Sequence, residues 1–177
     1  LMTEVAAEMA NGVIAHGFTT VQYLRQVTLP AVQRGLEKSG REREQFEINC
    51  PAMVVTGLTE EAFLASKLAV QGQIAFYAST PAYRPVLEVH GWGELQAEAN
   101  QLTRENRWQD MGDLITDEIL NTFAVVSEDI NQVPMLLRER YGGLIDNWQC
   151  TVETGDSKAQ SRLVAAMQQD QANTLTQ

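Results

Sequence analysis

The stretch LMTEVAAEMANGVIAHG, residues 1–17, decides the fold. Apolar side chains recur at helical spacing over residues 3–9, so this part is predicted to be a helix. Asn11 and Gly12 end that helix, and the apolar run that follows predicts a short strand ending at His16. A helix that leads directly into a strand is the second half of a strand–helix–strand unit. The first strand of that unit is expected before the first residue.

The same alternation of helices and strands continues along the chain. Three strands are predicted, at Gly12–His16, Ile48–Val55 and Leu144–Val152, and the helices between them predict parallel pairing. Pro30 interrupts the second helical pattern and predicts either a kink or two abutting helices there. The punctuated segment 78–126 is predicted to be an insertion of polar helices. Three strands alone would leave open edges, so the chain is predicted to be an α/β portion of a larger sheet or barrel.

Composition narrows the class of protein. The chain has 177 residues and a net charge of -10, which disfavours a nucleic-acid partner because phosphate backbones bind clustered Lys and Arg. No apolar run reaches the roughly 20 residues of a membrane span, and no leader precedes the first helix, so a cytoplasmic protein is expected. Cys50 and Cys150 have no metal-type spacing and are predicted to be reduced thiols, with a disulfide between them as the alternative.

Four stretches together resemble the luciferase-like monooxygenase superfamily, in particular its branch of coenzyme F-420-dependent oxidoreductases. The first carries ANGV at residues 10–13, after a helix that begins near Met2. The second is the helix TTVQYLRQVTLPAVQRGLEKSGR, residues 19–41, and the fourth is LRERYGGLIDNW, residues 137–148. The third, QIAFYASTPAYRPVLEVHGWGEL at residues 73–95, resembles the F-420-dependent branch most closely. The resemblance covers most of residues 1–152.

The resemblance implies a TIM (β/α)₈ barrel. Residues 1–177 would be the C-terminal part of that barrel, strands six to eight with their helices, with the helical insertion at about 78–126. The implied activity is hydride transfer between coenzyme F-420, or alternatively FMN, and a small organic substrate. The whole protein is expected to be a homo-oligomer, and the 177-residue chain alone is expected to be inactive.

The resemblance also implies cofactor-binding residues. Leu1, Met2 and Thr3 begin a helix, whose free N–H groups and positive dipole end favour the cofactor phosphate. His16 and Gly17 end the first strand, at the edge where such barrels bind ligands. The alternative for His16 is a histidine with a purely structural role.

Tyr83 and Trp92 are predicted to line the substrate pocket, because flat rings can cover a ring-shaped cofactor or an apolar substrate. The alternative is that these rings fill a small core within their own segment. No catalytic residue is assigned. The sequence contains no GxGxxG, P-loop, zinc spacing or nucleophile elbow. Two other hypotheses stay open, a non-catalytic partner subunit and an inactive barrel fragment.

Overall fold

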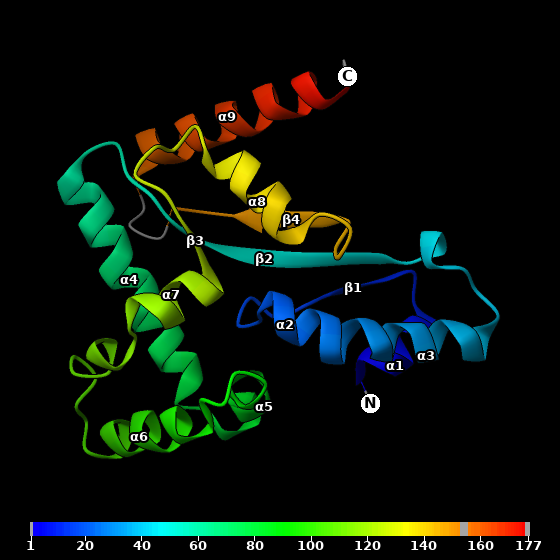
Figure 1. The fold of residues 1–177 in the computed structure, drawn as a ribbon, viewed down its shortest axis with the longest axis horizontal. Helices are drawn as coiled ribbons and strands as arrows, with labels where there is room; N and C mark the ends of the chain where they lie inside the picture. Colours follow the sequence, from blue (N-terminus) through cyan, green and yellow to red (C-terminus); the bar gives the residue numbers. More distant parts are fainter. Residues whose placement is uncertain (1, 153–155, 176–177) are drawn as a thin grey trace.

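The computed structural model describes residues 2–152 and 156–175. Four short strands alternate with helices, and the chain order is easily followed in Figure 1. The strands are β1 (Gly12–Ile14), β2 (Glu47–Val55), β3 (Ala124–Val126) and β4 (Asn147–Cys150). The helices are α1 (Met2–Met9), α2 (Val21–Tyr23), η1 (Leu24–Thr28), α3 (Leu29–Ser39), η2 (Arg43–Gln45), α4 (Glu60–Ala78), η3 (Pro81–Tyr83), α5 (Arg84–Glu88), α6 (Gly93–Arg104), η4 (Gly112–Leu114), α7 (Asp117–Phe123), α8 (Val133–Tyr141) and α9 (Ser157–Leu175).

Strand β2 is the centre of the sheet. Its residues 47–49 pair with β1, residues 49–52 with β4 and residues 53–55 with β3. All three pairings are parallel, which confirms the prediction from the alternation of helices and strands. Because β1 and β4 both pair with Asn49, they lie on opposite edges of β2.

The number and length of the strands were predicted less well. Strand β3 was missed, because helix α7 runs directly into it and no glycine or proline separates Phe123 from Ala124. Strand β1 ends at Ile14, two residues early. Strand β4 begins three residues late, because the N–H groups of Leu144 and Ile145 turn back to the Tyr141 carbonyl (2.9 and 3.3 Å) and do not join the sheet.

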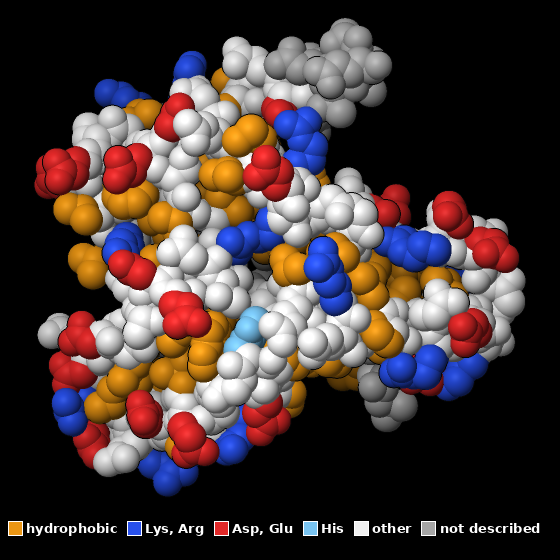
Figure 2. Space-filling model, in the orientation of Figure 1, with side chains coloured by type: hydrophobic (Ala, Val, Ile, Leu, Met, Phe, Trp, Pro, Cys, Tyr) orange, Lys and Arg blue, Asp and Glu red, His pale blue; other side chains and the backbone are white. Residues whose placement is uncertain are grey.

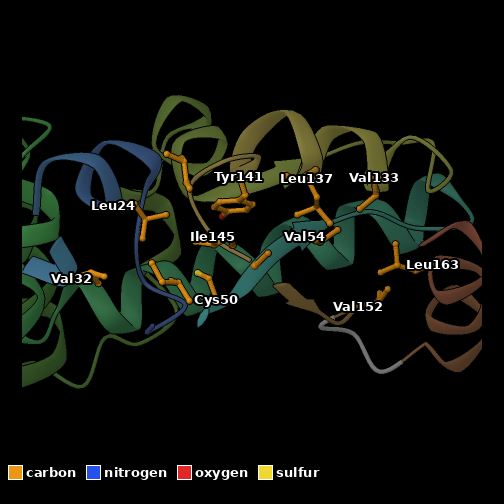
Figure 3. Close-up of a cluster of buried hydrophobic side chains, with 14 of the residues drawn as sticks. Leu24, Val32, Cys50, Val54, Val133, Leu137, Tyr141, Ile145, Val152 and Leu163 are labelled. Atoms are coloured by element: carbon orange, nitrogen blue, oxygen red, sulfur yellow. The ribbon is translucent and has the colours of Figure 1, made fainter. Parts of the chain in front are cut away.

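One face of the sheet is covered by helices. Alternate side chains of a strand point to opposite faces, and the even-numbered residues of β2 point toward α3 and α8. They join a buried apolar cluster with residues from both helices and from α9 (Figure 3). Its members include Leu24, Val32, Leu36, Ile48, Cys50, Val54, Val133, Leu137, Tyr141 and Leu163.

The opposite face is open over most of its length. The strand register aligns Ile14, Asn49 and Asn147 in one row across β1, β2 and β4. The Ile14 side chain is 70% exposed, and no helix within the described residues covers this row. Parallel sheets are normally covered on both faces, so this face has the character of a surface that another layer would cover.

The second apolar cluster covers the open face only at the C-terminal end of β2. There Met53 and Val55 contact the lobe made by α4 to α7, together with Phe18. Thr59 caps the N-terminus of helix α4, because its hydroxyl accepts the Ala62 N–H (3.1 Å). This lobe contains most of segment 78–126, the predicted insertion.

The predicted disturbance at Pro30 takes the form of a π-helical turn, Leu24–Thr28, immediately before α3. The Leu29 N–H donates to the Leu24 carbonyl, five residues back. Proline has no N–H and crowds the preceding turn, which explains why the regular α-helical ladder is interrupted here.

Both cysteines are free thiols, as predicted. Cys50 pairs with Trp148 across the sheet and Cys150 pairs with Ala52, so the two thiols are not direct cross-strand neighbours. Burial raises the pKa of each thiol to about 11.

None of the helices in the described ranges is long and apolar enough to span a membrane.

Candidate functional site

A cavity of about 540 Å³ lies on the open face of the sheet, beside the C-terminal ends of β1 and β4. Parallel strands bring their carboxyl ends to one edge, which is why residues distant in sequence meet there. The C-terminal half of α4 crosses this edge and supplies Gln73 and Tyr77. The strands and the residues that follow them supply Ile14, Ala15, His16, Gly17, Pro51, Ala52, Met53, Gln149, Cys150 and Thr151.

The described residues that line this cavity carry no carboxylate, lysine or arginine. Ile14, Pro51 and Met53 give it apolar walls, while the amides of Gln73 and Gln149 can donate and accept hydrogen bonds. Such a lining suits a largely uncharged, flat organic group with a few polar atoms at its edge.

His16 is held by two hydrogen bonds. Its Nδ1 accepts the Phe18 N–H (3.0 Å), and its Nε2 lies 3.1 Å from the Tyr83 hydroxyl oxygen. Since Nδ1 accepts, the neutral ring carries its hydrogen on Nε2 and donates it to Tyr83. The hydroxyl hydrogen of Tyr83 is therefore free for another acceptor. Burial lowers the pKa of His16, which favours this neutral form.

Five aromatic rings gather where β1 meets the lobe. The His16 ring lies 4.8 Å from that of Tyr77 in an edge-to-face arrangement and 4.7 Å from that of Tyr83. Phe18 contacts both tyrosines and stacks on Phe123 (4.5 Å). This cluster fixes the C-terminal end of α4, and with it Tyr77, at the edge of the cavity.

The structure places the predicted cofactor residues in two different regions. His16 and Gly17 line the cavity. Leu1 lies outside the described residues. Met2 and Thr3 begin α1 and do not line the cavity, and the Met2 side chain is 87% exposed.

The two predicted aromatic residues also separate. Tyr83 does not line the cavity, but its hydroxyl contacts Nε2 of His16, which does line it. Trp92 stacks on His90 (4.7 Å) and packs against the second apolar cluster. Ring packing within the segment, the alternative considered for both residues, is therefore what the structure shows for Trp92.

Most of the other lining residues were not predicted, among them Tyr77, Gln73 and Gln149. Tyr77 and Gln73 are four residues apart and so share one face of α4, a spacing that the sequence displays. Gln149 and Asn147 alternate with Trp148 and Cys150, the period-two pattern of a strand with one polar face.

In the described ranges no group of three or more His, Cys, Asp or Glu residues is arranged to hold a metal ion.

Comparison with known proteins identifies the family. The model of luciferase-like monooxygenases matches residues 1–147. The chain belongs to this family. Proteins described as uncharacterized from Mycobacterium bovis (Mb1395) and Mycobacterium tuberculosis (Rv1360) are each 46% identical to it over 145 residues. These matches cover 82% of this chain and 42% of each relative, so the chain spans less than half of their length.

Two solved structures share the fold. The coenzyme F-420-dependent tetrahydromethanopterin reductase from Methanopyrus kandleri superposes with a TM-score of 0.70 at 18% identity, over 93% of this chain and 46% of that one. An F-420-dependent secondary alcohol dehydrogenase, in complex with an F-420–acetone adduct, superposes with a TM-score of 0.57 at 13% identity, over 93% and 45%. The resemblance to the luciferase-like superfamily, stated from the sequence motifs, is confirmed.

Proposed function

We propose that this chain forms the C-terminal part of a luciferase-like (β/α)₈ barrel, and that the barrel transfers a hydride between coenzyme F-420 and an organic substrate. The observation that carries the proposal is the cavity on the open sheet face at the strand ends. Active sites of TIM barrels lie at that end. Both solved structures reported above are described as F-420-dependent enzymes, which supports the choice of cofactor.

The open sheet face supports the barrel. The row formed by Ile14, Asn49 and Asn147 would face the interior of a closed barrel, where the remaining strands would cover it. Within the described residues no strand pairs with the outer edge of β1 or β4. The superposed enzymes are about twice as long as the matched region, which is room enough for the missing strands.

The residues present fit a deazaflavin or flavin. The Tyr77 ring with Ile14 and Met53 offers apolar surface for a flat ring system, and Gln73 and Gln149 offer amides to its polar edge. When bound, such a cofactor supplies the hydride-carrying centre. The chain's own groups would orient the ring and the substrate and exclude water from them.

The start of α1 remains our proposal for the cofactor phosphate. Glu4 in its first turn would repel a phosphate, but its carboxylate is paired with Lys38 and with Arg34 (3.3 Å). The hydrogen bond from Lys38, followed by that from Arg34, lowers the pKa of Glu4. These two cations offset the negative charge of Glu4, so the free N–H groups at Met2 and Thr3 can favour an anion.

A chimera tests the proposed function. Residues 1–147 would replace the matching segment of the Mycobacterium tuberculosis relative, which supplies the rest of the barrel. We expect one-to-one binding of F-420 in a fluorescence titration, and no useful binding by the isolated 177-residue chain, whose cavity lacks its other wall. In the chimera, Tyr77→Ala should weaken binding about tenfold, whereas Phe76→Ala, next to it but outside the cavity lining, should not.

Three results would change the proposal. Tight FMN binding without F-420 affinity would reverse the choice of cofactor. Tight one-to-one binding by the isolated chain would contradict the barrel. A folded chimera that binds neither cofactor would favour a non-catalytic partner subunit.

A further inference from the structure

A second cavity lies in the helical layer, apart from the strand ends. Its volume is about 560 Å³, and its walls come from α2 and η1, the end of α7, the last turn of α8 and the residue His90 after α5. Figure 2 shows Lys or Arg side chains bordering a hollow near the middle of this face, in the region between α2 and α7 in Figure 1. It shares no lining residue with the cavity on the sheet.

Two arginines line this cavity in a protein whose net charge is -10. The Arg140 guanidinium donates to the carbonyls of Asn121 (2.6 Å) and Thr122 (3.3 Å), which uses two of its five N–H donors. Arg25 has no hydrogen-bond or ion-pair partner within the described part of the chain. Among the described residues no carboxylate lines this cavity, and Glu139 lines only an adjoining one of about 470 Å³.

A π-helical turn places Arg25 at this cavity. Arg25 and Gln26 lie within the π-helical turn, Leu24–Thr28. A π turn inserts an extra residue into the helix and rotates the side chains that follow, and such turns are frequent at functional sites. Gln26 also lines the cavity and, within the described residues, its amide has no partner.

Neutral polar groups complete the wall. The Gln22 amide is fixed by its bond to the Val89 carbonyl. His90 Nε2 lies 2.8 Å from the Thr20 hydroxyl, and the ring stacks on Trp92, so its position is fixed by two contacts. These groups add hydrogen-bonding capacity to the cavity without adding negative charge.

We propose that this cavity binds a phosphate group, carried by a small phosphorylated molecule or as free phosphate. Guanidinium groups present planar sets of donors that match phosphate oxygens, and they stay charged at any physiological pH. Arg25 and Arg140 both line this cavity, and its volume has room for more than the phosphate alone. The proposed site is independent of the proposed cofactor pocket.

Isothermal titration calorimetry of the purified protein with inorganic phosphate tests the site, at an ionic strength held constant with sodium chloride. We expect saturable one-to-one binding, and Arg25→Gln should weaken it about tenfold or more through loss of charge-assisted hydrogen bonds. Arg104→Gln is the matched control, because it makes the same change of charge in the last turn of α6, outside this cavity. Arg25→Lys should retain intermediate affinity, since it keeps the charge without the planar donors.

Failure to see saturable phosphate binding to the wild-type protein would overturn the proposal, and so would equal weakening by Arg25→Gln and Arg104→Gln. Circular dichroism melting of each variant separates loss of binding from loss of fold. Because Arg25 is an exposed side chain without internal partners, both variants should melt with the wild-type protein. A second titration uses a phosphorylated sugar. If the sugar phosphate binds more tightly than inorganic phosphate, the ligand is a phosphorylated metabolite; if the two bind equally well, the ligand is free phosphate.

Discussion

The two faces of strand β2 differ in how far they are covered. On one face Ile48, Cys50 and Val54 are completely buried beneath helices. On the other, Asn49 and Pro51 remain partly accessible and the neighbouring Ile14 is 70% exposed. Because the side-chain period of a strand is two, consecutive residues belong to these two environments. Over residues 48–51 the strand therefore stabilises the fold with every second residue and leaves the others accessible, whereas Met53 and Val55 are buried beneath the lobe.

The chemistry of each face agrees with this division. The covered face of β2 is apolar, whereas the open face carries the amides Asn49, Asn147 and Gln149 beside apolar Ile14. Interiors of TIM barrels are usually packed with branched apolar side chains. Amides in this position can contact solvent or a ligand, which agrees with the cavity that begins at the same row.

The largest expected effect is a difference in stability between adjacent residues of β2. Ile48→Ala removes a side chain with 0% exposure and should lower the free energy of unfolding by about 2–5 kcal/mol, through lost burial and a cavity. Asn49→Ala, on the open face and without a side-chain hydrogen bond in the described part of the chain, should change it by about 0.5 kcal/mol or less. Urea denaturation of both variants measures the difference.

Equal effects at the two positions would contradict the assignment of faces. In the chimera with the mycobacterial relative the comparison becomes sharper. There the proposed remaining strands would cover the open face, so Asn49→Ala should cost more than it does in the isolated chain. An unchanged small cost in the chimera would argue against closure of the barrel over this row.

Two helical glycines extend the comparison to the helices. In α3, a Cβ at Gly35 would lie 2.2 Å from the Glu4 carbonyl oxygen, so Gly35→Ala should force α1 and α3 apart and cost about 1–3 kcal/mol. In α4, a Cβ at Gly72 would meet nothing within 4 Å, and Gly72→Ala should stabilise by about 0.5–1 kcal/mol. Thermal melts with opposite shifts would support this; a loss of stability at both sites would not.

A smaller effect is expected where the lobe meets β1. Tyr83→Phe keeps the ring contacts but removes the acceptor for His16 Nε2–H, which should cost about 0.5–1.5 kcal/mol. Tyr23→Phe is the matched control, because within the described residues the Tyr23 hydroxyl makes no hydrogen bond. If the two variants are equally stable, the His16–Tyr83 contact contributes nothing to holding the lobe.

The sequence allowed the strand–helix alternation, the parallel pairing and the family to be predicted, because these depend on local periodicity and on motifs. Strand β3 was missed because three apolar residues directly after a helix carry no boundary signal, and only pairing with residues 53–55 makes them a strand. Its position depends on contacts between distant parts of the chain, which periodicity does not report.

The site was predicted in part for a similar reason. His16 and Gly17 could be named because they end a predicted strand, and strand ends are where such folds bind ligands. Tyr77 reaches the same cavity from α4, a helix that crosses the strand ends. No local sequence pattern indicates the direction in which that helix runs. Trp92 belongs to the same quoted motif, but its ring stacks on His90 and does not line this cavity.

The smallest expected effect is a dependence of stability on pH from the two histidines that link the sheet to the lobe. Burial lowers the pKa of both His16 and His90 below the ordinary value of 6.5. The folded state therefore binds fewer protons than the unfolded state as the pH falls below about 6.5. The contribution of each histidine is fully present above that value and is lost as the pH falls through the lowered, folded-state pKa.

Protonation of His16 has a structural cost of its own. A protonated ring would carry hydrogen on Nδ1, which now accepts the Phe18 N–H, so that bond would be lost. We therefore expect the midpoint of urea denaturation to decline between pH 7 and pH 5, above the range where most carboxylates titrate. The double variant His16→Asn, His90→Gln should decline less, because it keeps polar groups at both positions but cannot gain the protons. If the double variant follows the same slope as the wild-type protein, other groups control the pH dependence, and the neutral form that we assign to His16 does not contribute to it.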